Sequence, residues 1–207
     1  MTPDLPKTPR VVLDACVLYP TILRTLLLKV AARGLFTPVW SARLLEEWAR
    51  AAARRGALDE AGARGEIALL RAAWPAAEQL PAPGIEARLW LPDANDVHVL
   101  ATAIASSADG LLTRNVRDFP RGTLREEGVA RYEPDGFLMA LWLRSPEDVD
   151  AAVAALWDAA RRVEADSSSS ETTGTRTAPH APPSTVRGLL KKAQLPRLAK
   201  ALSPTAQ

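Results

Sequence analysis

Residues 91–120 read LPDANDVHVLATAIASSADGLLTRNVRDFP, a stretch in which a helical pattern leads into a short apolar run. From Asp96 onward, apolar residues recur at the spacing i, i+3, i+4 and i+7, which is typical of one face of an amphipathic helix. These residues are Val97, Leu100, Ala101 and Ile104. Asp93 is a good N-cap for this helix, and Asp96 lies in its first turn. The helix is therefore expected to begin with carboxylates.

The second half of the same stretch predicts a strand followed by a polar loop. We expect Asp109 and Gly110 to close the helix and Leu111 and Leu112 to form a short buried strand. The loop after the strand contains Thr113, Arg114, Asn115 and Asp118. Since ligands of open α/β sheets bind beyond the carboxyl ends of the strands, the sequence predicts a functional site here.

A second carboxylate follows another apolar run near the start of the chain. Residues 10–13 predict a strand, and Asp14 comes directly after it. Helix capping alone would explain Asp93 and Asp96, and it would be the preferred interpretation if they stood alone. Because Asp14 also lies at the end of a predicted strand, a cluster of acids becomes the better hypothesis.

The helix that begins after Ser41 offers two further acids. Its apolar face comprises Leu44, Leu45, Trp48 and Ala52. At 100° per residue, Glu46 falls among arginines on the solvent face, where a pair with Arg50 is expected, whereas Glu47 lies nearer the apolar face. We therefore favour Glu47 as the functional acid.

Four motifs together resemble the PIN-domain nucleases. They are LDACVLYP from residue 13, SARLLEEWARA from 41, DANDVHVLATA from 93 and GLLTRNVRDFP from 110, within residues 10–133. Within that family, the chain is similar to the VapC-type toxins of bacterial toxin–antitoxin pairs. The resemblance implies a Mg²⁺- or Mn²⁺-dependent endoribonuclease, with RNA as substrate and a cognate antitoxin protein as partner.

The resemblance also implies roles for individual residues. Asp14, Glu47, Asp96 and Asp118 would be the catalytic acids and metal ligands, and Thr113 and Asn115 would support them. Carboxylate oxygens suit hard cations such as Mg²⁺. Arg114 and Arg117 are candidates for RNA phosphate contacts, with solvated loop arginines as the equal alternative. His98 is interpreted as a satisfied or exposed histidine and Cys16 as a small buried residue.

Composition sets the broad class. Of 207 residues, 47% are hydrophobic, enough for one packed domain with appendages, and a single cysteine excludes an internal disulfide. The start of the chain has no apolar segment, and no apolar run approaches the ~18 residues of a membrane span, so we expect a cytoplasmic protein with no membrane association. Residues 1–165 carry 20 Lys and Arg against 22 acids, whereas the remainder carries six against two.

The order of elements predicts a three-layer PIN-like α/β fold, with a central parallel sheet flanked by helices and a C-terminal helical extension. Further strands are expected at 35–39 and 129–132, a helix at 56–74, and a strand or extended lead-in at 85–91. The expected units are a nuclease domain at 10–133, a helical extension at 134–165, a disordered linker at 166–186 and a short basic amphipathic tail at 187–202 that is separable from the body. The extension could also form a homodimer.

Other function classes share parts of this pattern. A haloacid-dehalogenase-like phosphatase also places an Asp after its first strand, but it has a second Asp two residues later, where this chain has Cys16. A non-catalytic PIN-like module that binds RNA or protein would be expected to lose one of the four acids. A housekeeping RNA-processing nuclease would share every feature of the site and differ from a toxin only in its biological role.

Overall fold

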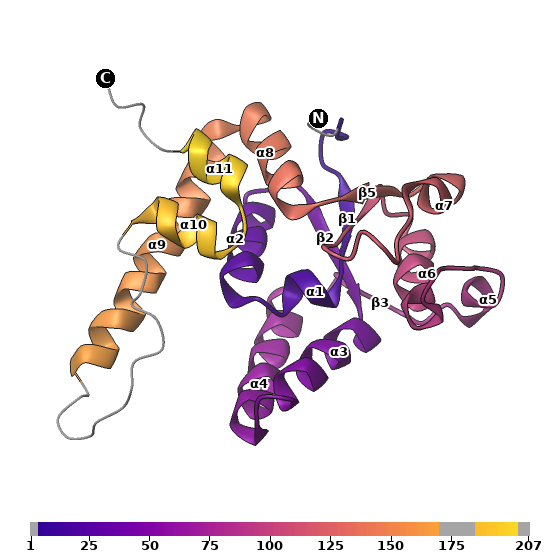
Figure 1. The fold of residues 1–207 in the computed structure, drawn as a ribbon, viewed down its shortest axis with the longest axis horizontal. Helices are drawn as coiled ribbons and strands as arrows, with labels where there is room; N and C mark the ends of the chain where they lie inside the picture. Colours follow the sequence, from indigo (N-terminus) through magenta and orange to yellow (C-terminus); the bar gives the residue numbers. More distant parts are fainter. Residues whose placement is uncertain (1–3, 170–184, 203–207) are drawn as a thin grey trace.

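The computed structural model describes residues 4–169 and 185–202, and its centre is a parallel five-stranded sheet with helices on both faces (Figure 1). The strands are β1 (Arg10–Leu13), β2 (Thr37–Ser41), β3 (Glu78–Gln79), β4 (Gly110–Leu112) and β5 (Ala130–Tyr132). Their order across the sheet is β3-β2-β1-β4-β5, and every neighbouring pair is parallel. The expected three-layer α/β architecture is confirmed.

The two central strands explain why the sheet is covered on both sides. Val11, Val12 and Leu13 of β1 and Leu111 and Leu112 of β4 are all fully buried. Strands with such continuous apolar runs belong in the middle of a parallel sheet, where helices cover both faces. The strand order reverses between β1 and β4, so the carboxyl ends of these two strands form the switch point of the sheet.

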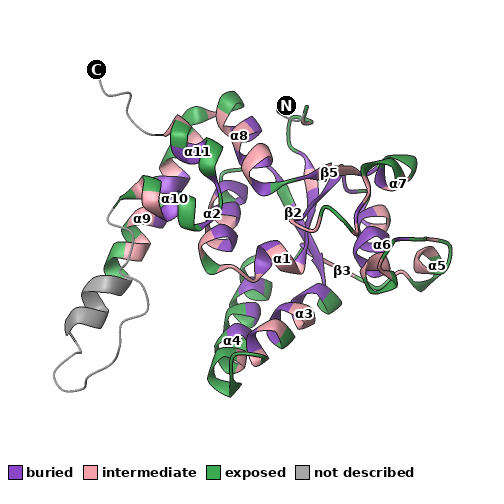
Figure 2. Cartoon of the chain, in the orientation of Figure 1, coloured by how far each residue is buried: buried purple, intermediate pink, exposed green. Residues whose placement is uncertain are grey.

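The helices follow the apolar patterns of the sequence. They are α1 (Ala15–Leu18), α2 (Thr21–Ala32), α3 (Ala42–Ala53), α4 (Ala57–Ala73), α5 (Pro83–Glu86), α6 (Val97–Ala105), α7 (Arg121–Glu126), α8 (Pro134–Arg144), α9 (Pro146–Ser169), α10 (Val186–Lys192) and α11 (Pro196–Ala201), with a 3₁₀ turn at Ala94–Asp96. Helix α6 packs on β1 and β2, whereas α9 packs on α2 and α8. Their inward faces are the buried ones (Figure 2). Among the described helices, none has the length and apolar character that a membrane crossing requires.

The end of α6 differs from the expectation. The helix ends at Ala105, and Ser107 takes the left-handed conformation with φ 49° in place of Gly110. Gly110 is instead the first residue of β4. A Cβ atom there would lie 2.3 Å from Tyr132 Cε2 and 2.7 Å from the Ala130 carbonyl oxygen. Glycine is therefore needed because β5 approaches so closely, and the predicted role in ending the helix is wrong.

Two strand expectations also need correction. The strand expected at 35–39 begins two residues later, at Thr37. Of the two alternatives at 85–91, the strand is absent, because the short helix α5 covers the start of this segment and begins at Pro83, a position that proline favours. The fifth strand is β3, which was not expected from the sequence. Two residues at a sheet edge are too few to show an alternating pattern.

The C-terminal segment is not separable from the body. Residues 185–202 form the helices α10 and α11, and Leu189, Leu190, Leu195 and Leu198 are buried within the main core. These two helices, called the C-terminal hairpin below, pack on α8 and α9 (Figure 1). The predicted amphipathic character is present, but its partner is the chain itself. Most of the linker expected at 166–186 lies outside the described residues.

Candidate metal centre

Asp14 and Thr113 join the ends of the two central strands. Asp14 follows β1, and its backbone N–H donates to the Leu112 carbonyl of β4 at 3.1 Å. The buried Thr113 hydroxyl, directly after β4, donates to Asp14 Oδ2 at 2.5 Å. This neutral donor holds the carboxylate at the switch point, where the topology places a ligand. The two predicted residues, 99 positions apart in sequence, are therefore in direct contact.

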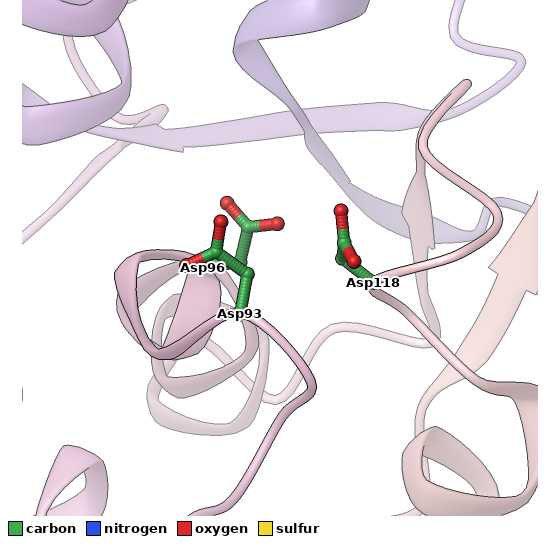
Figure 3. A group of neighbouring side chains, drawn as sticks. All are labelled: Asp93, Asp96 and Asp118. Carbon is green, nitrogen blue, oxygen red and sulfur yellow. The ribbon is translucent and has the colours of Figure 1, made fainter.

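Three carboxylates converge beside this point. Asp93, Asp96 and Asp118 each offer an oxygen, and these atoms lie within 4.8 Å of one another. Figure 3 shows Asp93 and Asp96 on the helix side and Asp118 opposite them, on the loop after β4. Asp93 also caps the 3₁₀ turn by accepting from the Asn95 backbone N–H at 2.9 Å. Asp93 is not among the metal ligands that the sequence predicts, so its convergence with Asp118 is new.

Asn115 ties these groups together. Its side-chain nitrogen donates to Asp96 Oδ2 at 3.1 Å, and its side-chain oxygen accepts from the Asp118 backbone N–H at 3.3 Å. Its own backbone N–H donates to the Thr113 hydroxyl at 2.9 Å. The side-chain amide of Asn115 therefore orients Asp96 and the Asp118 loop, and its backbone N–H orients the Thr113 hydroxyl beside Asp14.

The acids interact strongly at Asp96. Burial, followed by the charges of Asp14, Asp93, Asp118 and Glu47, raises the pKa of the Asp96 carboxyl to about 6. All four predicted acids, together with Asp93, therefore share one electrostatic environment. Like charges at this separation oppose ionisation, and a bound cation would relieve that opposition.

The two neighbouring glutamates of α3 have different surroundings. Glu46 forms the expected ion pair with Arg50, at 3.3 Å, and a second one with Arg64, at 3.0 Å. Glu47 Oε1 lies 2.8 Å from His98 Nε2 and 3.5 Å from Arg43 Nε. Glu47 thus faces α6 and the acidic cluster, whereas Glu46 faces α4.

His98 is buried, with 3% of its surface exposed, so an exposed histidine is excluded. Its Nε2 atom lies 2.8 Å from Glu47 Oε1 without the geometry of a hydrogen bond. Neither ring nitrogen has a hydrogen-bond partner among the described residues, so the expectation of a satisfied histidine is also wrong.

Cys16 contacts the site, although the sequence indicated only a small buried residue. Its thiol donates to Asp14 Oδ2 at 3.0 Å, and its sulfur accepts from the Arg114 backbone N–H at 3.2 Å. Burial, reinforced by the Asp14 charge and hydrogen bond, raises the thiol pKa to about 12. The protonated thiol acts as a second neutral donor to Asp14, and it is not a nucleophile at neutral pH.

The two loop arginines differ. Arg114 extends away from the acids and donates through Nη2 to the Ala193 carbonyl of the C-terminal hairpin at 2.6 Å, and burial lowers its pKa. Arg117 is exposed to solvent. The guanidinium group of Arg114, which was predicted to contact an RNA phosphate, therefore binds a carbonyl of its own chain. Arg117 remains accessible to solvent.

The donor set fits a divalent metal ion. Asp93, Asp96 and Asp118 supply only oxygen ligands, and hard cations such as Mg²⁺ and Mn²⁺ prefer these. Burial, and after it the charges of the neighbouring carboxylates, raises the pKa of Asp96, so a bound cation would favour its ionised form. Of the predicted ligands, Asp96 and Asp118 belong to the close group, Asp93 joins them, and Asp14 and Glu47 lie near enough to influence Asp96.

Comparison with known proteins identifies the family. A family model described as the PIN domain matches residues 10–117, just over half of the chain. The matched region contains β1, β2 and β4 as well as Asp14, Glu47, Asp93 and Asp96, and it ends one residue before Asp118. The comparisons with curated proteins and with solved structures find no match. On the strength of the family model, the chain belongs to the PIN domain family.

Proposed function

We propose that the protein is a divalent-metal-dependent endoribonuclease. The observation that carries the proposal is the convergence of the Asp93, Asp96 and Asp118 carboxylates within 4.8 Å, at the switch point of a PIN domain. Asp14 and Glu47 complete the acidic surroundings of Asp96. Acids arranged in this way suit the hydrolysis of a phosphodiester bond, a reaction that needs no nucleophilic side chain.

The residues of the chain would act by holding and orienting. Asp93, Asp96 and Asp118 would hold the cation, and Asn115 would orient two of these groups through the bonds described above. Asp14 stays fixed because Thr113 and Cys16 both donate to it. When bound, Mg²⁺ or Mn²⁺ would supply charge neutralisation at the scissile phosphate and a more acidic water. Glu47, held beside His98 and Arg43, would add negative charge at the edge of the site.

The test is Mg²⁺-dependent cleavage of a mixed RNA pool. We expect Asp14→Asn and Asp96→Asn each to lower the cleavage rate by about 100-fold or more. Asp96→Asn removes the charge of a proposed metal ligand, and Asp14→Asn removes the charge of its acidic neighbour. Glu46→Gln is the matched control on the solvent face and should cleave at the wild-type rate. Undiminished cleavage by both purified Asn variants would refute the proposed site. RNA binding by a wild type that cleaves nothing would favour a non-catalytic binding module.

The finer assignment is that the nuclease is the toxin of a type II toxin–antitoxin pair, held inactive by a cognate antitoxin in the cytoplasm. Its support is the resemblance of the four sequence motifs to the VapC-type toxins. Expression of the wild type alone should stop growth, and Asp14→Asn should relieve the arrest. Normal growth at a high level of active enzyme would instead favour a housekeeping nuclease that processes RNA.

A further inference from the structure

The C-terminal hairpin is fastened to the body at both of its helix ends. Arg114 donates to the carbonyl of Ala193, the residue that ends α10, and so satisfies an orphan acceptor at a helix C-terminus. Asp135 of α8 accepts from the backbone N–H groups of Arg197 and Leu198, in the first turn of α11, at 2.9 and 3.1 Å. Four buried leucines complete the attachment. The hairpin therefore has a defined place on the body.

Arg114 links that place to the metal centre. Its backbone N–H donates to Cys16 Sγ, and the Cys16 thiol donates to Asp14. Its guanidinium group reaches Ala193. The turn of the hairpin is thus separated from the Asp14 side of the site by the length of one arginine side chain, and Lys191 and Lys192 immediately precede this turn.

The outer face of the hairpin is cationic. Arg187, Lys191, Lys192 and Lys200 are all exposed, and residues 185–202 contain no acid. Figure 2 shows the hairpin with its buried side against the body and its exposed side outward. We call these four residues the basic face. The body of the chain, in contrast, carries more acids than bases over residues 1–165.

A strand of RNA needs such a face. If one phosphate lies at the acidic centre, the phosphates beside it require cations elsewhere, because binding of a nucleic acid depends on neutralising its backbone. Two arginines next to the site already have partners: Arg43 contacts Glu47 and the Asn95 carbonyl, and Arg114 contacts Ala193. Arg117 adds one exposed charge. The turn at Ala193, which directly follows Lys191 and Lys192, lies one side chain beyond this loop.

We propose that the basic face of the C-terminal hairpin binds the phosphate backbone of single-stranded RNA beside the metal centre. The inference rests on the proposed function, since it takes RNA as the ligand. The hairpin then serves two roles: its leucines and caps hold it on the body, and its lysines extend the substrate surface. Arg114 is the positioning residue that connects the two.

The test compares two variants with the same change in charge. Lys191→Gln/Lys192→Gln removes two charges from the basic face. Lys7→Gln/Arg125→Gln removes two exposed charges at the opposite edge of the sheet, since Lys7 precedes β1 and Arg125 lies in the last turn of α7, ahead of β5. Binding to a 2′-O-methyl RNA oligonucleotide, which is not cleaved, is measured by fluorescence anisotropy with Mg²⁺ across a range of salt concentrations.

The hairpin variant should bind on the order of tenfold more weakly near 0.1 M salt, and the slope of log affinity against log salt should fall by about 1.4, or about 0.7 for each phosphate that is no longer neutralised. The control variant should match the wild type. An unchanged slope in the hairpin variant, or an equal loss in both variants, would overturn the proposal. Vesicles rich in phosphatidylserine serve as a second probe, and lysine-dependent binding to them without RNA binding would assign the face to a membrane instead. Because binding is measured without cleavage, these outcomes are independent of the nuclease assay.

Discussion

The metal centre and the C-terminal hairpin are stabilised in opposite ways. At the candidate metal centre, carboxylates of like charge lie together, and burial followed by their mutual repulsion raises the pKa of Asp96. The hairpin is held by its own buried leucines and by two side chains of the body, Arg114 and Asp135, which bind backbone groups of the hairpin. The first region lowers the stability of the fold when no cation is present, whereas the second raises it.

This contrast indicates what each region is for. A cluster of like charges is retained in a fold at a cost in stability, and a ligand of opposite charge removes that cost. An apolar contact supplemented by helix caps needs no ligand to be stable. The hairpin can therefore present its cations on a fixed support, next to a group of carboxylates that could hold a metal ion.

The largest expected effect is on stability, in the hairpin. Leu198 is fully buried, so Leu198→Ala should lower the free energy of unfolding by about 2–5 kcal/mol, through reduced burial and a remaining cavity. Urea denaturation measures this change. Leu143, which is 58% exposed, supplies the control, and Leu143→Ala should change stability by less than about 0.5 kcal/mol. Equal urea midpoints for the wild type and Leu198→Ala would show that the hairpin does not stabilise the body.

The second prediction separates the two glutamates of α3. Glu47→Gln should lower the RNA cleavage rate by about tenfold or more, because Glu47 faces the acidic centre, while Glu46→Gln should leave the rate within about twofold. Both changes keep the size of the side chain, so single-turnover rates can be compared directly. A larger loss in Glu46→Gln than in Glu47→Gln would reverse the assignment.

The third prediction concerns the cap on α11. Asp135→Ala removes the acceptor of two backbone N–H groups and should lower the free energy of unfolding by about 1 kcal/mol. Urea denaturation again measures the change, and Asp150→Ala, on the exposed side of α9, is the comparison. No loss in Asp135→Ala would mean that water replaces the carboxylate at no cost.

The smallest effect is expected at Asp96 without metal. The folded-state pKa of about 6 lies above the ordinary value of 3.8, so ionisation of Asp96 destabilises the fold as pH rises between these values, and the penalty is complete above about pH 6. Asp96→Asn should therefore melt at an equal or slightly higher temperature than the wild type at pH 7, and the difference should vanish near pH 4. Scanning calorimetry in EDTA measures both.

A drop of several degrees in Asp96→Asn at pH 7 would instead make Asp96 a structural residue. Added Mg²⁺ sharpens the same experiment: the wild type should gain stability through binding, and the variant should gain less. If Mg²⁺ stabilised both proteins equally, the cation would bind elsewhere.

Local sequence patterns predicted much of this molecule correctly. The apolar runs at 10–13 and 111–112 are strands, and the helical spacing after Ser41 correctly placed Glu46 in an ion pair with Arg50. Asp14 and Asp118 were found because they follow strands whose carboxyl ends share one edge of the sheet. Such features depend on spacings of a few residues, and a single sequence displays them.

Other features depend on contacts between distant parts of the chain. Asp93 had a complete local explanation as a helix cap, so nothing in its neighbours indicated that its oxygen meets that of Asp118. Cys16 showed no role in sequence because it bridges Asp14, two residues away, to Thr113 and Arg114 on a loop 97 and 98 positions away. The strand β3 is two residues long and is recognisable only by its pairing with β2.

By itself, the sequence predicted most of the helices, the two apolar strands β1 and β4, and the acids that follow them. Only the tertiary structure showed which acids interact electrostatically with Asp96, why residue 110 must be glycine, and that the basic tail packs on its own chain. The physical reason is that periodicity shows which face of a helix is apolar but not which surface covers it. The covering surface is decided by packing and by hydrogen bonds between distant parts of the chain, such as those that Arg114 and Asp135 make to the hairpin.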